Sequence, residues 1–150
     1  MRKTKDKRRF LLYAAAVLAV FAVLGVTVLR SYEDKIYSFV LENREGLEAE
    51  TLKILGGQKD SDSFKGVEIE GVYGGKNNIV QFFYGGFGII PSAKYYGFYY
   101  SENDVPAAYQ NCDYELAKTG ENSWEWSDGT DNGGITKRIT DNWFYYEAWF

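Results

Sequence analysis

The stretch Trp143–Phe150, which reads WFYYEAWF, carries six aromatic residues in eight positions. Leaving so much apolar surface in water costs several kcal/mol at about 25 cal/mol per Å². Aromatic residues also favour the half-buried faces of a pleated sheet. We therefore expect a strand over Asn142–Phe150 whose side chains help to build the core.

A second aromatic run, KYYGFYYS, lies upstream at Lys94–Ser101. Successive side chains of a strand point to opposite faces, so Tyr95 and Tyr99 share one face of this run. The remaining aromatic residues, Tyr96, Phe98 and Tyr100, share the other. A strand with aromatic side chains on both faces indicates a sheet that is covered on both sides.

Further segments with alternating or continuous apolar character stand between clusters of glycine, asparagine and aspartate, which are turn signals. Gly85–Gly88 and Pro91 interrupt the pattern and are expected to lie outside strands. The segments Val67–Tyr73 and Asn78–Tyr84 flank a tight turn and predict a hairpin. Together the pattern predicts an antiparallel meander whose strands are Val67–Tyr73, Asn78–Tyr84, Lys94–Ser101, Cys112–Lys118, Ser123–Ser127, Ile135–Thr140 and Asn142–Phe150.

The segment Ser31–Leu55 has apolar residues at helical spacing between charged positions, which predicts one amphipathic helix. Gly46 is a point at which this helix could bend or divide, and Gly56 with Gly57 is a strong stop. We expect residues 30–57 to form either a helical stalk or a helix packed on the sheet. Residues 58–150 then form an aromatic-rich antiparallel β domain.

The first 29 residues predict a membrane anchor. Residues 1–9 contain six Lys or Arg against one Asp, and Phe10–Leu29 is a run of 20 uncharged residues. A helix of that length crosses the roughly 30 Å hydrocarbon core of a bilayer, and flanking basic residues tend to stay cytoplasmic. The alternative, a cleaved signal peptide, normally has a shorter apolar region and a small-x-small cleavage site, and the end of this segment has no strong Ala-x-Ala pattern.

The fold class expected from these patterns is α+β. It consists of a single N-terminal transmembrane helix, one amphipathic helix and a curved antiparallel sheet of five to seven strands, with a partly closed barrel as the alternative. Residues 1–9 form a cytoplasmic stub, residues 10–29 the anchor, and the C-terminal domain is extracytoplasmic. We thus expect a single-pass protein of the cell membrane.

The net charge of residues 31–150 excludes several classes of binding partner. Residues 31–150 contain 10 basic and 20 acidic residues, a net charge of −10. Such a domain repels phosphate backbones, so we expect no nucleic-acid binding and no docking on anionic lipid. The single cysteine, Cys112, allows no intramolecular disulfide, and the sequence has no Asn-x-Ser/Thr glycosylation site. Both absences favour a bacterial surface protein.

Catalysis and cofactor binding have little support in the sequence. With no histidine, the chain cannot build histidine-dependent triads or two-histidine metal sites within one subunit. Glu68 and Glu70 share one strand face and could form a carboxylate site, although solvated surface acids are the commoner case. Asp60–Ser63 lacks the glycine of a calcium loop, and Asp128–Asn132 resembles an ordinary hairpin turn. We expect no catalytic residue, no cofactor and no metal.

Aromatic density is the remaining functional signal, with 24 Phe, Trp and Tyr among residues 31–150. Trp124 and Trp126 lie two apart on a predicted strand and could form a stacking platform, as could Tyr96 with Tyr100. The competing interpretation is that both tryptophans pack inward against the helix. These four residues are the predicted ligand-binding residues.

Three functions follow from these observations. The first is a non-catalytic interaction domain that binds another envelope or surface protein. The alternative is binding of cell-wall or environmental glycans through aromatic platforms. The most remote is a carboxylate-based hydrolase.

Deletion of Trp143–Phe150 should prevent folding, because the domain would lose six aromatic side chains from its core. The near-UV circular dichroism spectrum measures this, since it reports aromatic side chains held in a fixed environment. A truncated chain with an unchanged near-UV spectrum would contradict the prediction.

Overall fold

The computed structural model describes residues 31–75, 77–89 and 92–150. The predicted stub, 1–9, and the predicted anchor, 10–29, lie outside these residues, so both stay predictions. Among the residues that the structure does describe, no helix combines the length and the hydrophobicity needed to cross a membrane. Residues Tyr32–Phe150 form one compact unit.

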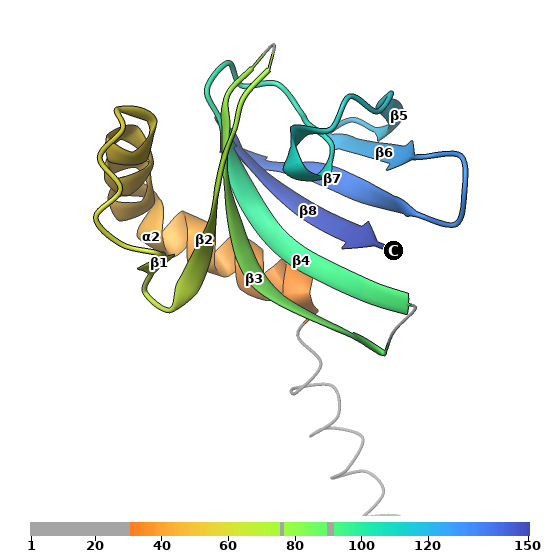
Figure 1. The fold of residues 1–150 in the computed structure, drawn as a ribbon, viewed down its shortest axis with the longest axis horizontal. Coiled ribbons are helices and arrows are strands. Elements are labelled where there is room, and N and C mark those ends of the chain that lie inside the picture. Colours follow the sequence, from red (N-terminus) through yellow and green to blue (C-terminus); the bar gives the residue numbers. More distant parts are fainter. Residues whose placement is uncertain (1–30, 76, 90–91) are drawn as a thin grey trace, which may run out of the picture. The chain divides into compact units, whose positions relative to one another are not determined.

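This unit is an α+β fold in which one helix packs on an open antiparallel sheet of eight strands (Figure 1). The sheet order is β1-β2-β3-β4-β8-β7-β6-β5. The elements are helix α2 (Tyr32–Leu55), β1 (Ser63–Phe64), β2 (Val67–Tyr73), β3 (Ile79–Ile89), β4 (Ser92–Ser101), the 3-10 turn η1 (Tyr109–Asn111), β5 (Ala117–Gly120), β6 (Ser123–Ser127), β7 (Gly133–Thr140) and β8 (Trp143–Trp149).

The sheet consists of two four-stranded meanders joined side by side. Strands β1 to β4 form one meander, β5 to β8 form the other, and β4 pairs with β8 from Lys94 opposite Trp149 to Tyr100 opposite Trp143. The prediction of a single meander was wrong, because the chain leaves the sheet plane after β4 and returns at an outer edge. The barrel alternative was also wrong, since β1 and β5 are the two open edges.

Helix α2 packs on one face of the sheet rather than standing apart as a stalk. Its inward side buries Ile36, Val40 and Leu47 completely, in a cluster with Phe98 and Trp143 from the central strands. Burying three such side chains contributes about 1.5–3 kcal/mol each. The helix begins at Tyr32, one residue later than predicted, and ends before Gly56 and Gly57 as expected.

Gly46 does not divide the helix, which runs unbroken from Tyr32 to Leu55. The ring of Phe64 in β1 lies so close that a Cβ atom at position 46 would be 3.0 Å from its Cζ. The glycine therefore makes room for an aromatic ring. Its helix-weakening effect of about 1 kcal/mol is offset by this packing.

Two strand predictions need correction. Strand β3 continues through Gly85–Gly88 to Ile89, where an interruption was expected. A Cβ atom at Gly85 would lie 2.8 Å from the ring of Tyr32, so glycine here permits close approach of the helix. The predicted strand Cys112–Lys118 is absent, because only Ala117 and Lys118 join the ladder of β5.

The opposite face of the sheet is covered by residues 102–116, which we call the 102–116 connection. Beneath it lies a second buried cluster, which contains Tyr99 from β4 with Phe144 and Tyr146 from β8. The prediction that the Lys94–Ser101 strand is covered on both faces is thus confirmed. Strand β8 lies between β4 and β7 and buries Trp143, Phe144, Tyr145, Tyr146 and Ala148, so its predicted core role is confirmed too.

Phe98 and Phe87 provide a matched test of this packing, since the first is 0% exposed and the second 61% exposed. Phe98→Ala should lower the free energy of unfolding by about 3–5 kcal/mol, because it leaves a cavity beside Phe82 and Trp143. Phe87→Ala should change it by about 0.5 kcal/mol or less. Urea denaturation of the detergent-solubilised chain, followed by tryptophan fluorescence, measures both. Similar losses in the two variants would contradict the assignment of the core.

Candidate functional site

The four predicted ligand-binding residues do not come together. Tyr96 and Tyr100 lie on the sheet face covered by helix α2, whereas Trp124 and Trp126 lie on the other face. Tyr96 is buried under the first residue of the helix, since its ring stacks on Tyr32 with a centroid distance of 4.5 Å. Tyr100 is buried edge-on against Trp143.

Trp124 and Trp126 share a face of β6, as their spacing predicts. The interpretation that both pack against the helix was wrong, because the 102–116 connection covers this face instead. Trp124 is half-buried against Phe144, and Trp126 is buried. The ring of Tyr114 stacks on Trp126 at 4.9 Å with an angle of 3° between the planes.

Tyr114 is therefore the aromatic residue that meets solvent at this place. It is 39% exposed, while the tryptophan beneath it is buried. Sequence reasoning missed Tyr114 because it assigned the residue to a strand. No sequence signal indicates this role, because a single aromatic residue in a polar stretch such as Asn111–Glu115 is ordinary.

The 102–116 connection is long, and its backbone is unusual. Connections of about 15 residues without regular structure are uncommon in compact domains and are often functional. Of the five non-glycine residues with positive φ among the described residues, this connection contains Asp104, Gln110 and Asn111. Such conformations persist only where surrounding contacts hold them, and they are enriched at binding sites.

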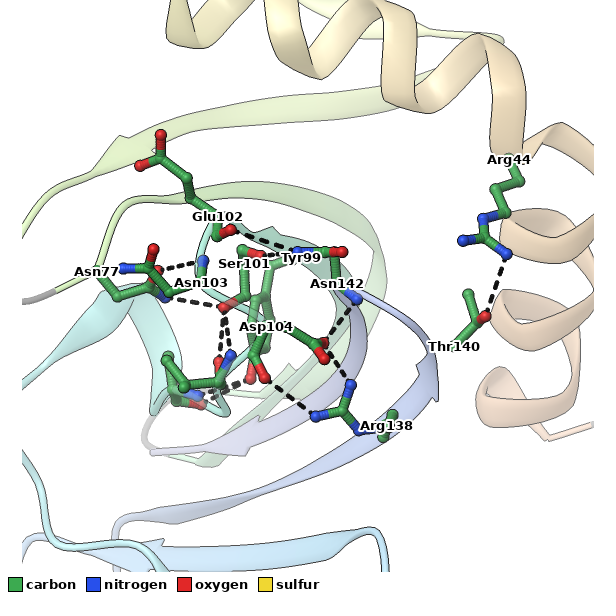
Figure 2. A network of polar contacts seen from close by, with 12 residues as sticks. Arg44, Asn77, Tyr99, Ser101, Glu102, Asn103, Asp104, Arg138, Thr140 and Asn142 are labelled. Carbon is green, nitrogen blue, oxygen red and sulfur yellow. Dashed lines mark hydrogen bonds and ion pairs between the residues drawn. The ribbon is translucent and has the colours of Figure 1, made fainter.

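Asp104 fixes the start of the connection (Figure 2). Its Oδ1 atom accepts a hydrogen bond from the guanidinium of Arg138 in β7 and another, at 2.7 Å, from the backbone N–H of Asn142. The guanidinium also lies 4.6 Å from the ring centroid of Phe144, a cation–π distance. The β7–β8 turn and the connection are thus tied together.

Two hydroxyl groups fix the next residues. Ser101 Oγ accepts a hydrogen bond from the backbone N–H of Val105 at 3.0 Å and one from the amide of Asn77 at 2.9 Å. The hydroxyl of Tyr99 accepts one from the backbone N–H of Ala107 at 2.8 Å. Figure 2 shows the hydrogen bonds that join Asn77 to Ser101 and to Asn103.

Asn111 fixes the end of this region. Its Nδ2 atom donates to the backbone carbonyls of Tyr73, Gly74 and Asn77, at 3.2, 3.0 and 2.9 Å. The amide thereby ties the connection to the β2–β3 turn. The loop is therefore held in one shape by side chains of β4 and β7 and by polar groups of the β2–β3 and β7–β8 turns.

The 102–116 connection and the β2–β3 turn line an open depression of about 510 Å³, which we call the loop hollow. Val105 and Tyr114, which are 43% and 39% exposed, are the large apolar side chains at its surface. The hollow is lined by Gly74, Gly75, Asn77, Val105, Pro106, Ala107, Ala108, Asn111, Cys112, Asp113, Tyr114 and Leu116.

Of the two acids considered for a carboxylate site, Glu68 is exposed and Glu70 is half-buried. Glu70 accepts hydrogen bonds from Gln81 at 2.6 Å, Tyr146 at 3.0 Å and Tyr109 at 3.3 Å. Burial, with the Glu70 carboxylate as the next cause, raises the pKa of the phenols of Tyr109 and Tyr146, which therefore stay protonated donors. Both oxygens of Glu70 are thus occupied by internal donors.

The acidic turn of the β6–β7 hairpin is held by its own side chains. Asp128 Oδ1 accepts from the backbone N–H of Thr130 at 2.9 Å, and Oδ2 accepts from the amide of Asn132 at 2.9 Å. The hydroxyl of Thr130 also donates to Oδ1 at 2.6 Å, and this bond, followed by the one from Asn132, lowers the pKa of Asp128. No group of three or more His, Cys, Asp or Glu within the described ranges could hold a metal ion.

Comparison of the chain with protein-family models, with curated proteins and with solved structures finds no match. We therefore infer the function from the geometry of the loop hollow and its surroundings.

Buried tyrosines predict alkaline unfolding. Burial, together with the nearby Glu33 carboxylate, raises the pKa of Tyr37 to about 12. Burial is also the main reason that the pKa values of Tyr99, Tyr145 and Tyr146 are raised. In the unfolded chain tyrosines lose their protons near pH 10, so above that pH the unfolded state binds fewer protons and stability falls.

These groups should leave stability unchanged between about pH 7 and 9 and reduce it as the pH rises from about 10 through 12. Absorbance at 295 nm and near-UV circular dichroism should then change together, in one cooperative step. Ionisation of every tyrosine near pH 10 without loss of the near-UV spectrum would contradict the prediction.

Proposed function

We propose that the protein is a single-pass membrane protein whose extracytoplasmic domain binds another protein through the loop hollow, without catalysis. The anchor part of this proposal is supported by the uncharged run 10–29 and its basic flank. The binding part is supported by a rigid loop that presents exposed apolar side chains around a depression. Preformed, rigid surfaces of this kind bind with a smaller entropic cost than mobile loops.

A protein partner is favoured over a glycan because the side-chain amides that line the loop hollow are already hydrogen-bonded within the domain. Asn77 uses its amide oxygen for the backbone N–H of Asn103 and its nitrogen for Ser101. The nitrogen of Asn111 is occupied by three carbonyls. Few lining side-chain amides are left to recognise sugar hydroxyls. The exposed Val105 and Tyr114 instead suit apolar side chains of a protein.

The negative charge around Tyr114 indicates the chemical character of the partner. Asp113 and Glu115 are exposed on both sides of Tyr114, and the domain has a net charge of −10. We expect the partner to present an apolar group flanked by basic residues, because opposite charges steer association. An envelope or surface protein of this character is the proposed partner, and nucleic acid is disfavoured for the same electrostatic reason.

Glycan binding is the second candidate, and one observation favours it. Tyr114 stacked on Trp126 presents one exposed ring face on a firm support, which is the arrangement on which a sugar ring can stack. A carboxylate-based hydrolase at Glu70 is the remote alternative, since both oxygens of that carboxylate accept internal hydrogen bonds.

A photoreactive amino acid placed at Val105 in the native membrane should crosslink the partner, whereas the same group at Leu52 on helix α2 should not. Leu52 is a matched control because it is 55% exposed and lies outside the hollow. Val105→Asp and Tyr114→Ala should each weaken binding of the captured partner about 10-fold or more, as expected for central interface residues. Leu52→Asp should leave the affinity unchanged.

Equal crosslinking from both positions, or full affinity in Val105→Asp, would contradict the protein-binding proposal. A saturable change in tryptophan fluorescence on titration with glycans, lost in Tyr114→Ala, would favour the second candidate. Hydrolysis that disappears in Glu70→Gln would favour the third.

A further inference from the structure

A separate group of aromatic rings joins the first residue of helix α2 to Phe87 near the end of strand β3. Figure 1 shows the backbone of these two elements. The ring of Tyr32, the first helical residue, stacks on Tyr96 at 4.5 Å. The ring of Tyr96 lies 6.0 Å from that of Phe87, which is 61% exposed. Three rings in a row thus connect the start of the helix to the outer end of β3.

Phe87 lines an open depression of about 590 Å³, which we call the aromatic hollow. Besides Phe87, this hollow is lined by Ser92, Lys94, Asp131, Trp149 and Phe150, among others. The ammonium of Lys94 lies 5.6 Å from the ring centroid of Trp149 and 2.6 Å from a carboxylate oxygen of Glu147. The surface therefore combines exposed aromatic rings with a lysine whose charge is already paired.

Tyr32, at one end of this row of rings, follows the predicted anchor closely in the sequence. Arg30 directly follows the uncharged run 10–29 and precedes Tyr32 by two residues, which is at most about 7 Å of extended chain. No spacer follows, because α2 is packed into the domain from its first turns, with Ile36 completely buried. At most two residues of chain therefore separate Tyr32 from the end of the predicted anchor.

We propose that the aromatic hollow rests on the interface of the phospholipid bilayer, with Phe87 inserted among the headgroups. This inference rests on the membrane anchor in the proposed function and goes beyond it by giving the domain an orientation. Aromatic rings and the apolar stem of lysine both favour the interface between headgroups and hydrocarbon. The lipid is zwitterionic, because the acidic domain gains nothing from anionic headgroups.

The orientation has a consequence for the loop hollow. Strand β3 runs from Phe87 to Ile79 and continues into the turn held by Asn111. Eight residues at about 3.3 Å each separate the two ends by roughly 26 Å. The aromatic hollow thus holds the loop hollow away from the bilayer, in reach of a partner.

The test uses the full chain in phosphatidylcholine vesicles, with and without nitroxide-labelled lipid. An environment-sensitive fluorophore is attached at position 92 in the double variant Ser92→Cys, Cys112→Ser. The matched control carries the same fluorophore on the native Cys112, which is exposed in the loop hollow. We expect blue-shifted emission and severalfold stronger quenching by the labelled lipid at position 92.

Adding Phe87→Ser should reduce the quenching at position 92 towards the value at Cys112, while Leu52→Ser should not. Both residues are highly exposed, so both variants should keep the near-UV spectrum of the parent. Anionic lipid should give no increase in quenching. Equal quenching at the two positions would overturn the inference. If the chain also stays in the vesicles after an alkaline wash, the membrane anchor is still supported.

Two further results would also overturn it. Loss of the chain from the vesicles on alkaline washing would refute the anchor and the inference together. A blue shift at position 92 that depends on protein concentration and is insensitive to labelled lipid would show that a second copy of the chain covers the aromatic hollow.

Discussion

The pairing of β4 with β8 is the interaction on which the rest of the structure depends. It joins two meanders that would otherwise each be a four-stranded sheet with two open edges. The pairing is rich in aromatic contacts, since Phe98 lies opposite Tyr145 and the rings of Tyr99 and Phe144 stack at 5.2 Å. Such ring pairs add about 0.5–1.5 kcal/mol each to the free energy gained from burial.

Because both faces of this central pair are apolar, the chain must cover both. Helix α2 covers one face, and the 102–116 connection covers the other. A loop can cover a face only if its backbone groups are satisfied, which explains its hydrogen bonds to Tyr99, Ser101 and Gln81. The same bonds give the loop hollow its fixed shape. The segment that covers the core therefore also forms the candidate binding surface.

The sequence predicted the elements of this fold better than their arrangement. Strand β6 was predicted with its observed bounds, and the helix and β8 were each within one residue. The continuation of β3 through Gly85–Gly88 was missed, because a glycine cluster in a sequence indicates a turn. The structure explains it by the pairing of these residues with β4 and by the close approach of Tyr32 to Gly85. For the candidate site, Trp126 was named, but the exposed ring stacked upon it belongs to Tyr114.

By itself, the sequence determined how many faces of each helix or strand are apolar, because periodicity and aromatic spacing are local properties of the chain. It also determined the acidity of the domain and the absence of histidine chemistry. Only the tertiary structure decided that β4 pairs with β8, that the two tryptophans lie under the 102–116 connection, and that Tyr114 and Phe87 are exposed in two separate hollows. Those features depend on contacts between residues far apart in the chain, such as Asp104 with Arg138, which no local pattern encodes.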